Sequence, residues 1–138
     1  MPLKVPFAAS LIFGNNDIAG LLAGSQLCAY KSAHTPANSD VAATYTAIEA
    51  TFSGYARITL SVWSAAVLDG ANRASVSSAV RTWTASGAGL PQSIHGIFVL
   101  DGAGNLLYAE EIPTGPVTLT VAGNAFSYQP VFTGKSEF

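Results

Sequence analysis

Hydrophobic and polar residues alternate most clearly between Tyr55 and Trp63. In that stretch, single polar, charged or aromatic residues separate four aliphatic ones, namely Ala56, Ile58, Leu60 and Val62. Successive side chains of a strand point to opposite faces, so the pattern predicts a strand with the aliphatic set on its core face. The residues that we expect in the core are Ile58, Leu60, Phe98 and Leu119.

Two β-hairpins are predicted in the second half of the chain. The first joins strands over 94–100 and 106–112 through Asp-Gly-Ala-Gly-Asn at 101–105, which is the chemistry of a tight turn. The second joins strands over 117–121 and 125–132 through Ala-Gly-Asn. The first strand of the first hairpin is apolar on both faces, as expected of a strand that is buried on both sides.

Strands are also predicted over 25–32 and, from a weaker pattern, over 73–85. A short helix is predicted over 16–23, where Asn16 or Asp17 can cap its first turn. Short strands separated by turns at this spacing are typical of all-β domains. The predicted fold is therefore mainly β, an antiparallel β-sandwich or barrel with one short N-terminal helix.

The 138 residues are expected to form a single β-rich domain, since neither an internal repeat nor a linker is visible. Pro6 favours an extended arm over 1–8, because proline cannot donate to a central ladder. Residues 133–138 are expected to form a tail. The arm and the tail could reach neighbouring subunits.

Charged residues make up only 10% of the chain, against about 25% in an average protein, and the net charge is −2. The bases are scattered, which argues against nucleic-acid binding, since phosphate recognition needs clustered cations. They are Lys4, Lys31, Arg57, Arg73, Arg81 and Lys135. A surface with so few charges is either buried against other subunits or covered by Ser, Thr, Asn and Gly.

The sequence does not predict a membrane span, a signal peptide or a disulfide. The apolar stretch near the N-terminus is interrupted at 14–17, whereas a spanning helix needs about 20 apolar residues. Cys28 is the single cysteine and lies within a predicted strand, so we expect a buried thiol. Synthesis in a cytoplasm is expected.

Candidate catalytic and metal-binding residues are few. His34 lies in a polar, proline-containing loop over 33–40, and His95 begins an apolar strand, but no nucleophile motif accompanies either histidine. The turn from Asp101 to Asn105 lacks the acidic spacing of a calcium loop. We therefore expect no catalytic residue, no metal site and no cofactor, and hence a protein that is not an enzyme.

Two tryptophans are the candidate interaction residues. Trp63 and Trp83 fall opposite the aliphatic set of their strands, and each shares its face with an arginine, Arg57 and Arg81 respectively. Tryptophan and arginine are enriched at interaction hot spots. Packing in the core, a protein interface and stacking on a sugar all remain open for the tryptophans.

Four stretches resemble a small structural protein of tailed bacteriophages. They are Leu3–Ala8, Glu49–Ala56, Gly96–Asp101 and Pro130–Thr133, and together they cover about a third of the chain. The resemblance implies a capsid decoration protein or a tail or fibre component, and such proteins have no catalytic residues to carry over. An N-terminal arm that adds to the sheet edge of a neighbour would suit this role.

The expected function is that of a capsid decoration subunit in the virion. Its expected partners are the major capsid protein or other virion proteins and further copies of itself, for example in a trimer, without nucleic acid or membrane. The alternative is a receptor- or carbohydrate-binding module of the tail that uses Trp63 or Trp83. In either case the protein would be made in the host cytoplasm.

Overall fold

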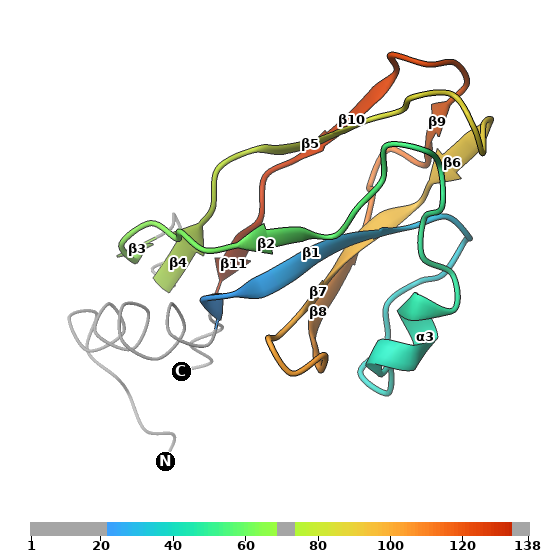
Figure 1. Cartoon of the computed structure of the whole chain (residues 1–138). Helices are drawn as coiled ribbons and strands as arrows, with labels where there is room; N and C mark the ends of the chain where they lie inside the picture. Colours follow the sequence, from blue (N-terminus) through green and yellow to red (C-terminus); the bar gives the residue numbers. More distant parts are fainter. Residues whose placement is uncertain (1–21, 69–73, 134–138) are drawn as a thin grey trace.

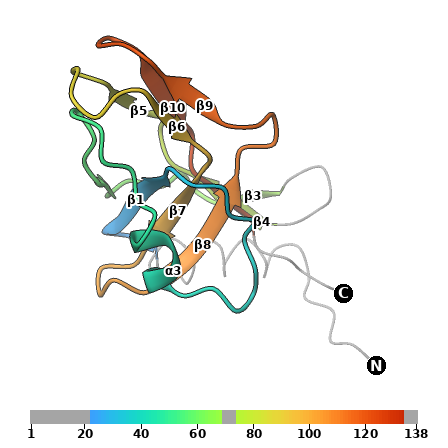
Figure 2. The same cartoon turned by 90° about the vertical axis from the view of Figure 1, so that its right-hand side faces the viewer.

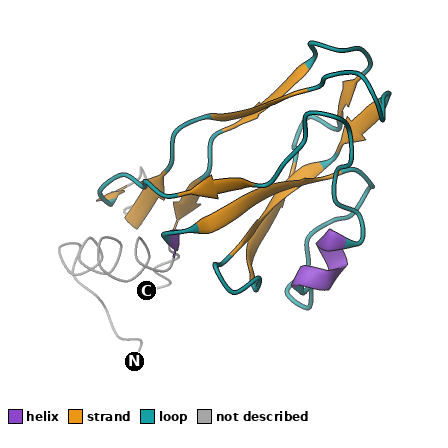
Figure 3. Ribbon diagram, viewed as in Figure 1, coloured by secondary structure: helices purple, strands orange, loops and turns teal. Residues whose placement is uncertain are grey.

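The computed structural model describes residues 22–68 and 74–133 (Figure 1). The predicted helix over 16–23, apart from its last two residues, the arm over 1–8 and the tail after Thr133 lie outside the described residues. The described part is mainly β, with antiparallel strands and the short helix α3 (Figure 3). Its strands do not close into a barrel, because each sheet ends in strands that have a neighbour on one side only.

A four-stranded antiparallel sheet lies at the centre, in the order β2-β1-β7-β8. Its strands are β1 (Ser25–Tyr30), β2 (Ile58–Leu60), β7 (Gly96–Leu100) and β8 (Leu106–Glu111). The predicted strand over 25–32 is thus confirmed except at its last two residues. All five positions of β7 are buried, as the apolar pattern on both of its faces predicts.

The first predicted hairpin is confirmed in the pairing of β7 with β8. Its turn is held by Asp101, whose side-chain Oδ1 accepts hydrogen bonds from the amides of Ala103 and Asn105 at 2.9 and 2.8 Å. Gly104 adopts a φ of 88°, a conformation that glycine allows at little cost. Local turn chemistry is therefore enough to specify this connection.

The second predicted hairpin is wrong in its pairing. The strands β9 (Val117–Leu119) and β10 (Ala125–Tyr128) follow each other around the expected turn but pair with different partners. Strand β9 pairs with β6 (Gln92–Ile94), and β10 pairs with β5 (Arg81–Thr84). The amide of Ala85 donates to the carbonyl of Asn124 at 2.8 Å, so the end of β5 holds the turn and β10 continues beside β5.

The predicted strand over 73–85 is divided between two sheets. Its first part is β4 (Ala74–Ser77), which lies between β3 (Val67–Leu68) and β11 (Val131–Thr133), and its second part is β5. The segment that pairs with β5 and β4 is interrupted at the same level. It forms β10 beside β5 and β11 beside β4, and Pro130 lies between the two. Proline has no amide hydrogen for a ladder, which explains the interruption in both strands.

The strand predicted from Tyr55 to Trp63 is shorter than expected, since β2 contains only three residues. Leu60 is buried and Ile58 is half-buried, but Ala56 is exposed and Val62 is 70% exposed. The reason is that β2 is an edge strand that pairs only with the first half of β1. The alternation continues beyond the residues that the sheet covers.

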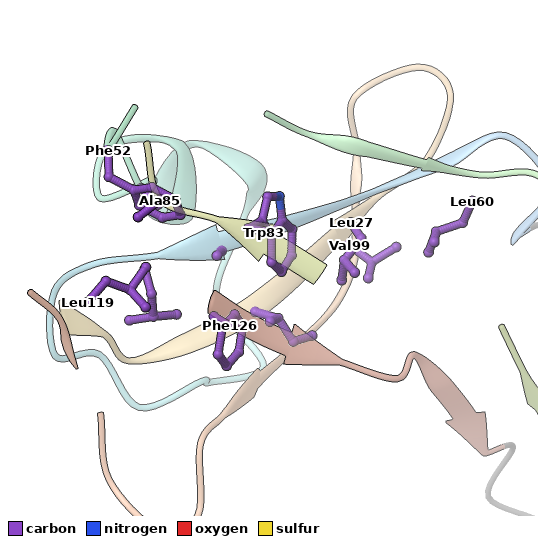
Figure 4. Packing of buried hydrophobic residues seen from close by; sticks show 12 residues of the cluster. Leu27, Phe52, Leu60, Trp83, Ala85, Val99, Leu119 and Phe126 are labelled. Carbon is purple, nitrogen blue, oxygen red and sulfur yellow. The ribbon is translucent and has the colours of Figure 1, made fainter. Parts of the chain in front are cut away.

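The main core lies between one face of the central sheet and the strands β5, β6, β9 and β10 (Figures 2 and 4). Leu27, Ala29, Leu60, Ile97 and Val99 come from the sheet, and Trp83, Ile94, Leu119 and Phe126 come from the opposite strands. Of the four residues expected in the core, Leu60, Phe98 and Leu119 are fully buried, and Ile58 packs at the edge.

The other face of the central sheet is covered by α3 (Ala42–Thr46), which the sequence pattern did not reveal. The ring of Tyr45 stacks on Phe98 of β7 with 5.4 Å between ring centroids and contacts Tyr30 of β1 at the same distance. A helix of five residues shows little 3.6-residue periodicity, so only its packing identifies it. Both faces of β1 and β7 are therefore buried.

Candidate interaction site

Arg57, a predicted interaction residue, is bound within the chain. Its Nε and Nη2 donate to the two carboxylate oxygens of Glu49 at 2.9 and 2.7 Å. Tyr55 donates to the same carboxylate at 2.7 Å, and its hydroxyl accepts the amide hydrogen of Ala29 in β1 at 3.2 Å. Through these bonds, Tyr55 and Arg57 attach the segment before β2 to Glu49 and to β1 of the central sheet.

The electrostatics of this cluster follow from its partial burial. Burial raises the pKa of Glu49, but the hydrogen bonds from Arg57 and Tyr55 and the charge of Arg57 together bring it below its usual value. Burial, and secondly the charge of Glu49, raises the pKa of the nearby Cys28 thiol to about 12. The prediction of a buried thiol is confirmed, since Cys28 is fully buried and protonated at neutral pH.

Trp83 is a core residue, with only 3% of its surface exposed. Its ring stacks on Phe126 at an interplanar angle of 7°, and its Nε1 donates to the carbonyl of Ala56 at 2.6 Å (Figure 4). Arg81, on the same face of β5, is half-buried. Of the three interpretations that the sequence left open for Trp83, this placement corresponds to core packing.

Trp63 lies after β2 and is half-buried. Its Nε1 donates to the carbonyl of Leu22 at 3.1 Å, and its ring packs against both the main core and a smaller cluster of Leu22, Ala66 and Val76. The structure therefore does not gather Trp63, Trp83, Arg57 and Arg81 into one exposed patch.

The loop over 33–40 is held by a network around Asp40. His34 Nε2 lies 2.8 Å from Asp40 Oδ2, and the same oxygen accepts hydrogen bonds from the Tyr45 hydroxyl and the Ala37 amide. These three contacts, that of His34 first, lower the pKa of Asp40 to about 2. Because Tyr45 belongs to α3, the network attaches the loop to this helix.

A groove of about 340 Å³ with a mainly apolar lining lies between the end of β8 and strand β10. Ile97 and Phe126, both members of the main core, line it. Further out it is bordered by Ile112, Pro113, Val117, Ala125, Ser127 and Tyr128, together with Glu110 and Glu111. The Tyr128 hydroxyl donates to Glu110, a short hydrogen bond that connects β10 to β8.

The charges of the groove are exclusively negative. Glu110 and Glu111 are exposed, and neither forms an ion pair with a cation of residues 22–68 or 74–133. Sequence reasoning missed this site, although one signal was present, since the predicted strand over 106–112 ends on Ile112 and a further apolar residue, Pro113, follows it directly. Only the packing of β10 opposite β8 turns them into the wall of a groove.

No protein-family model, curated protein or solved structure matches this chain. Within the described ranges, His, Cys, Asp and Glu side chains form no group of three or more that could hold a metal ion. No helix in the same ranges is long and apolar enough to cross a membrane. The candidate site is thus defined by the shape and chemistry of the groove.

Proposed function

We propose that this protein is a non-enzymatic structural subunit of a virion, a capsid decoration protein that binds the lattice of the major capsid protein. The observation that carries the proposal is the apolar groove between β8 and β10 on a domain with few charges. Monomeric proteins cover most of their apolar side chains, so an open groove that reaches core residues favours a partner.

The way in which the sheets pack supports the same role. We infer an antiparallel β-sandwich, in which the central sheet forms one layer and β5, β6, β9 and β10 form the other, with the main core between them. Such a domain leaves its strand edges at the sides, where further strands can be added. It combines a rigid centre with edges that bind neighbours.

The described surface also carries scattered apolar side chains. Six valines are between 44% and 70% exposed, namely Val41, Val62, Val67, Val80, Val121 and Val131. Single exposed valines are ordinary, but together with a 10% content of charged residues they suit a surface that is covered in an assembly.

Two of the stretches that carry the phage resemblance meet at β1. The amide of Ala50 donates to the carbonyl of Ala29 at 2.9 Å, and β7, which forms most of the stretch Gly96–Asp101, pairs with the opposite side of β1. These two of the four stretches therefore lie at the centre of the domain.

The alternative, a receptor- or carbohydrate-binding tail module, needs an open aromatic face. Sugars stack on exposed aromatic rings, whereas Trp83 is almost fully buried and Trp63 is half-buried. The geometry accordingly favours the decoration role.

The test is to measure how much of the protein binds to particles of the virus that encodes it. Decoration-free particles are mixed with the purified protein, and cryo-electron microscopy determines occupancy on the capsid and on the tail. We expect saturable density on the capsid lattice that does not change when sugars are added. Density confined to the tail, or an absence of binding, would contradict the proposal.

A further inference from the structure

The groove is flanked by two strands with unpaired edges. Among the described strands, β8 pairs only with β7, and β10 pairs only with β5. A small apolar molecule would fill the groove without contacting these main-chain groups. An extended peptide would both fill the groove and pair with a strand edge, so the site favours a strand as its occupant.

The described residues of the groove combine an apolar floor with an acidic rim. Glu110 and Ile97 are directly opposite in the register of β8 and β7, so Glu110 lies on the groove side of the sheet, above the apolar floor. Glu111, the next residue, points to the opposite face at the rim of the groove. A suitable strand would carry apolar side chains on alternate positions, toward the floor, and one cation on its other face. The acidic rim would then face a positive charge.

The first residues of the chain have this composition. Leu3, Val5 and Phe7 occupy alternate positions, as a strand with one apolar face requires, and Lys4 is the only charged residue among the first sixteen. Pro2 and Pro6 lie on the opposite set of positions, and they limit such a segment to pairing along one edge. The match is one of period, hydrophobicity and charge.

We propose that residues 2–8 of one copy bind as an added strand in the groove between β8 and β10 of a second copy. Leu3, Val5 and Phe7 contact the apolar floor, and Lys4, which points to the opposite face of the added strand, lies near Glu111. This inference deepens the proposed function, because it supplies the contact that would connect decoration subunits to one another. It does not itself require a capsid.

The positions of the groove and of the first described residue allow exchange between copies. Gly96 and Glu111 pair beside the groove at the Tyr30 end of β1, whereas the described chain begins at Leu22, before the Ser25 end. A donor at one end of the domain and an acceptor at the other give a head-to-tail contact, which can close into a ring. Residues 9–21 span about 40 Å when extended, which is enough to reach a neighbour.

The first experiment measures mass in solution. We expect the full chain to be an oligomer by native mass spectrometry and sedimentation, and a variant that lacks residues 1–8 to be a monomer. Ala125→Trp, which fills the groove at an exposed position, is also expected to give a monomer. Ala122→Trp is the matched control, because Ala122 is exposed in the turn before β10 and does not line the groove, and it should remain oligomeric.

A second experiment mixes the two monomeric variants, because a heterodimer can form only if both are folded. The variant without residues 1–8 keeps an intact groove, and Ala125→Trp keeps an intact N-terminal segment. Mixing the two monomers should therefore give a heterodimer with one copy of each. Absence of that heterodimer, a monomeric full chain, or an oligomer that survives either change would overturn the proposal.

A charge exchange tests the register. Lys4→Glu should weaken the association about tenfold, and the double variant Lys4→Glu/Glu111→Lys should recover much of that loss. Failure of the double variant to improve on the single one would exclude the proposed placement of Lys4. All of these measurements use the purified protein without particles, so a failed exchange is distinguishable from a failure to bind capsids.

Discussion

The two edges of the central sheet differ in the side-chain contacts that connect them to the rest of the domain. On the β2 side, Tyr55 and Arg57 both bond to Glu49, and the ring of Trp83 packs beside Tyr55. On the β8 side, a single hydrogen bond from Tyr128 to Glu110 lies next to a groove of about 340 Å³. Each side has a bond between a tyrosine and a glutamate, but only on the β2 side does an arginine also bond to that glutamate.

Under the proposed function, this difference separates the part of the domain that stabilises itself from the part that binds a partner. Glu49 has 16% of its side chain exposed and an ion pair with Arg57, so its bonds are partly shielded from water. Glu110 is exposed and has no cation partner among the described residues. Substitutions on the β2 side should therefore mainly change stability, and those on the β8 side should mainly change association.

Trp83→Ala should have the largest effect on stability. The substitution removes a buried ring that contacts Tyr55 and Phe126, and it should lower the free energy of unfolding by about 3–5 kcal/mol. Urea denaturation followed by circular dichroism measures the change. A cost similar to that of an exposed substitution such as Val121→Ala would show that the β2 side is not the stabilising one.

The two glutamates provide a matched pair. Glu49→Gln removes the charge that binds Arg57 and should cost about 1–3 kcal/mol, because the arginine is left without its partner. Glu110→Gln changes an exposed residue without an ion pair and should cost about 0.5 kcal/mol or less. The same urea measurement on both variants compares the two sides directly, and equal costs would remove the distinction.

Acid should weaken the β2 side first. The pKa of Glu49 in the folded protein lies below its ordinary 4.5, so its contribution is fully present above that pH and is lost as the pH falls through the folded-state pKa. The stability of the unchanged protein should therefore fall more steeply below pH 4.5 than that of Glu49→Gln. Asp40, whose pKa is about 2, is present in both proteins, so the difference between the two curves isolates Glu49. Parallel curves would contradict the assignment.

Tyr128→Phe should have a similarly small effect on stability. It removes one hydroxyl whose bond to Glu110 lies at the surface, so the expected cost is about 0.5 kcal/mol. Tyr55→Phe is the matched change on the β2 side and should cost more, since it removes bonds to both Glu49 and the amide of Ala29. If Tyr128→Phe proves the more costly, the β8 side is held more firmly than its contacts indicate.

Features that depend on neighbouring residues were predictable from the sequence. The hairpin of β7 and β8 follows from turn residues at 101–105 between two apolar runs, and its bonds to Asp101 are local. Burial of Cys28 follows from its apolar neighbours in β1. In each case the determining contacts are made by residues close together in the chain, which is why a pattern read along the chain is sufficient.

Features that depend on which strands meet were decided by the tertiary structure. Strand β10 pairs with β5 and not with β9, Trp83 points into the core, and α3 is recognisable only where Tyr45 packs on Phe98. The groove likewise needs β10 opposite β8, although the two strands belong to different sheets. Alternation along a strand separates its two faces, but it does not determine which face other strands will cover, because that depends on long-range packing.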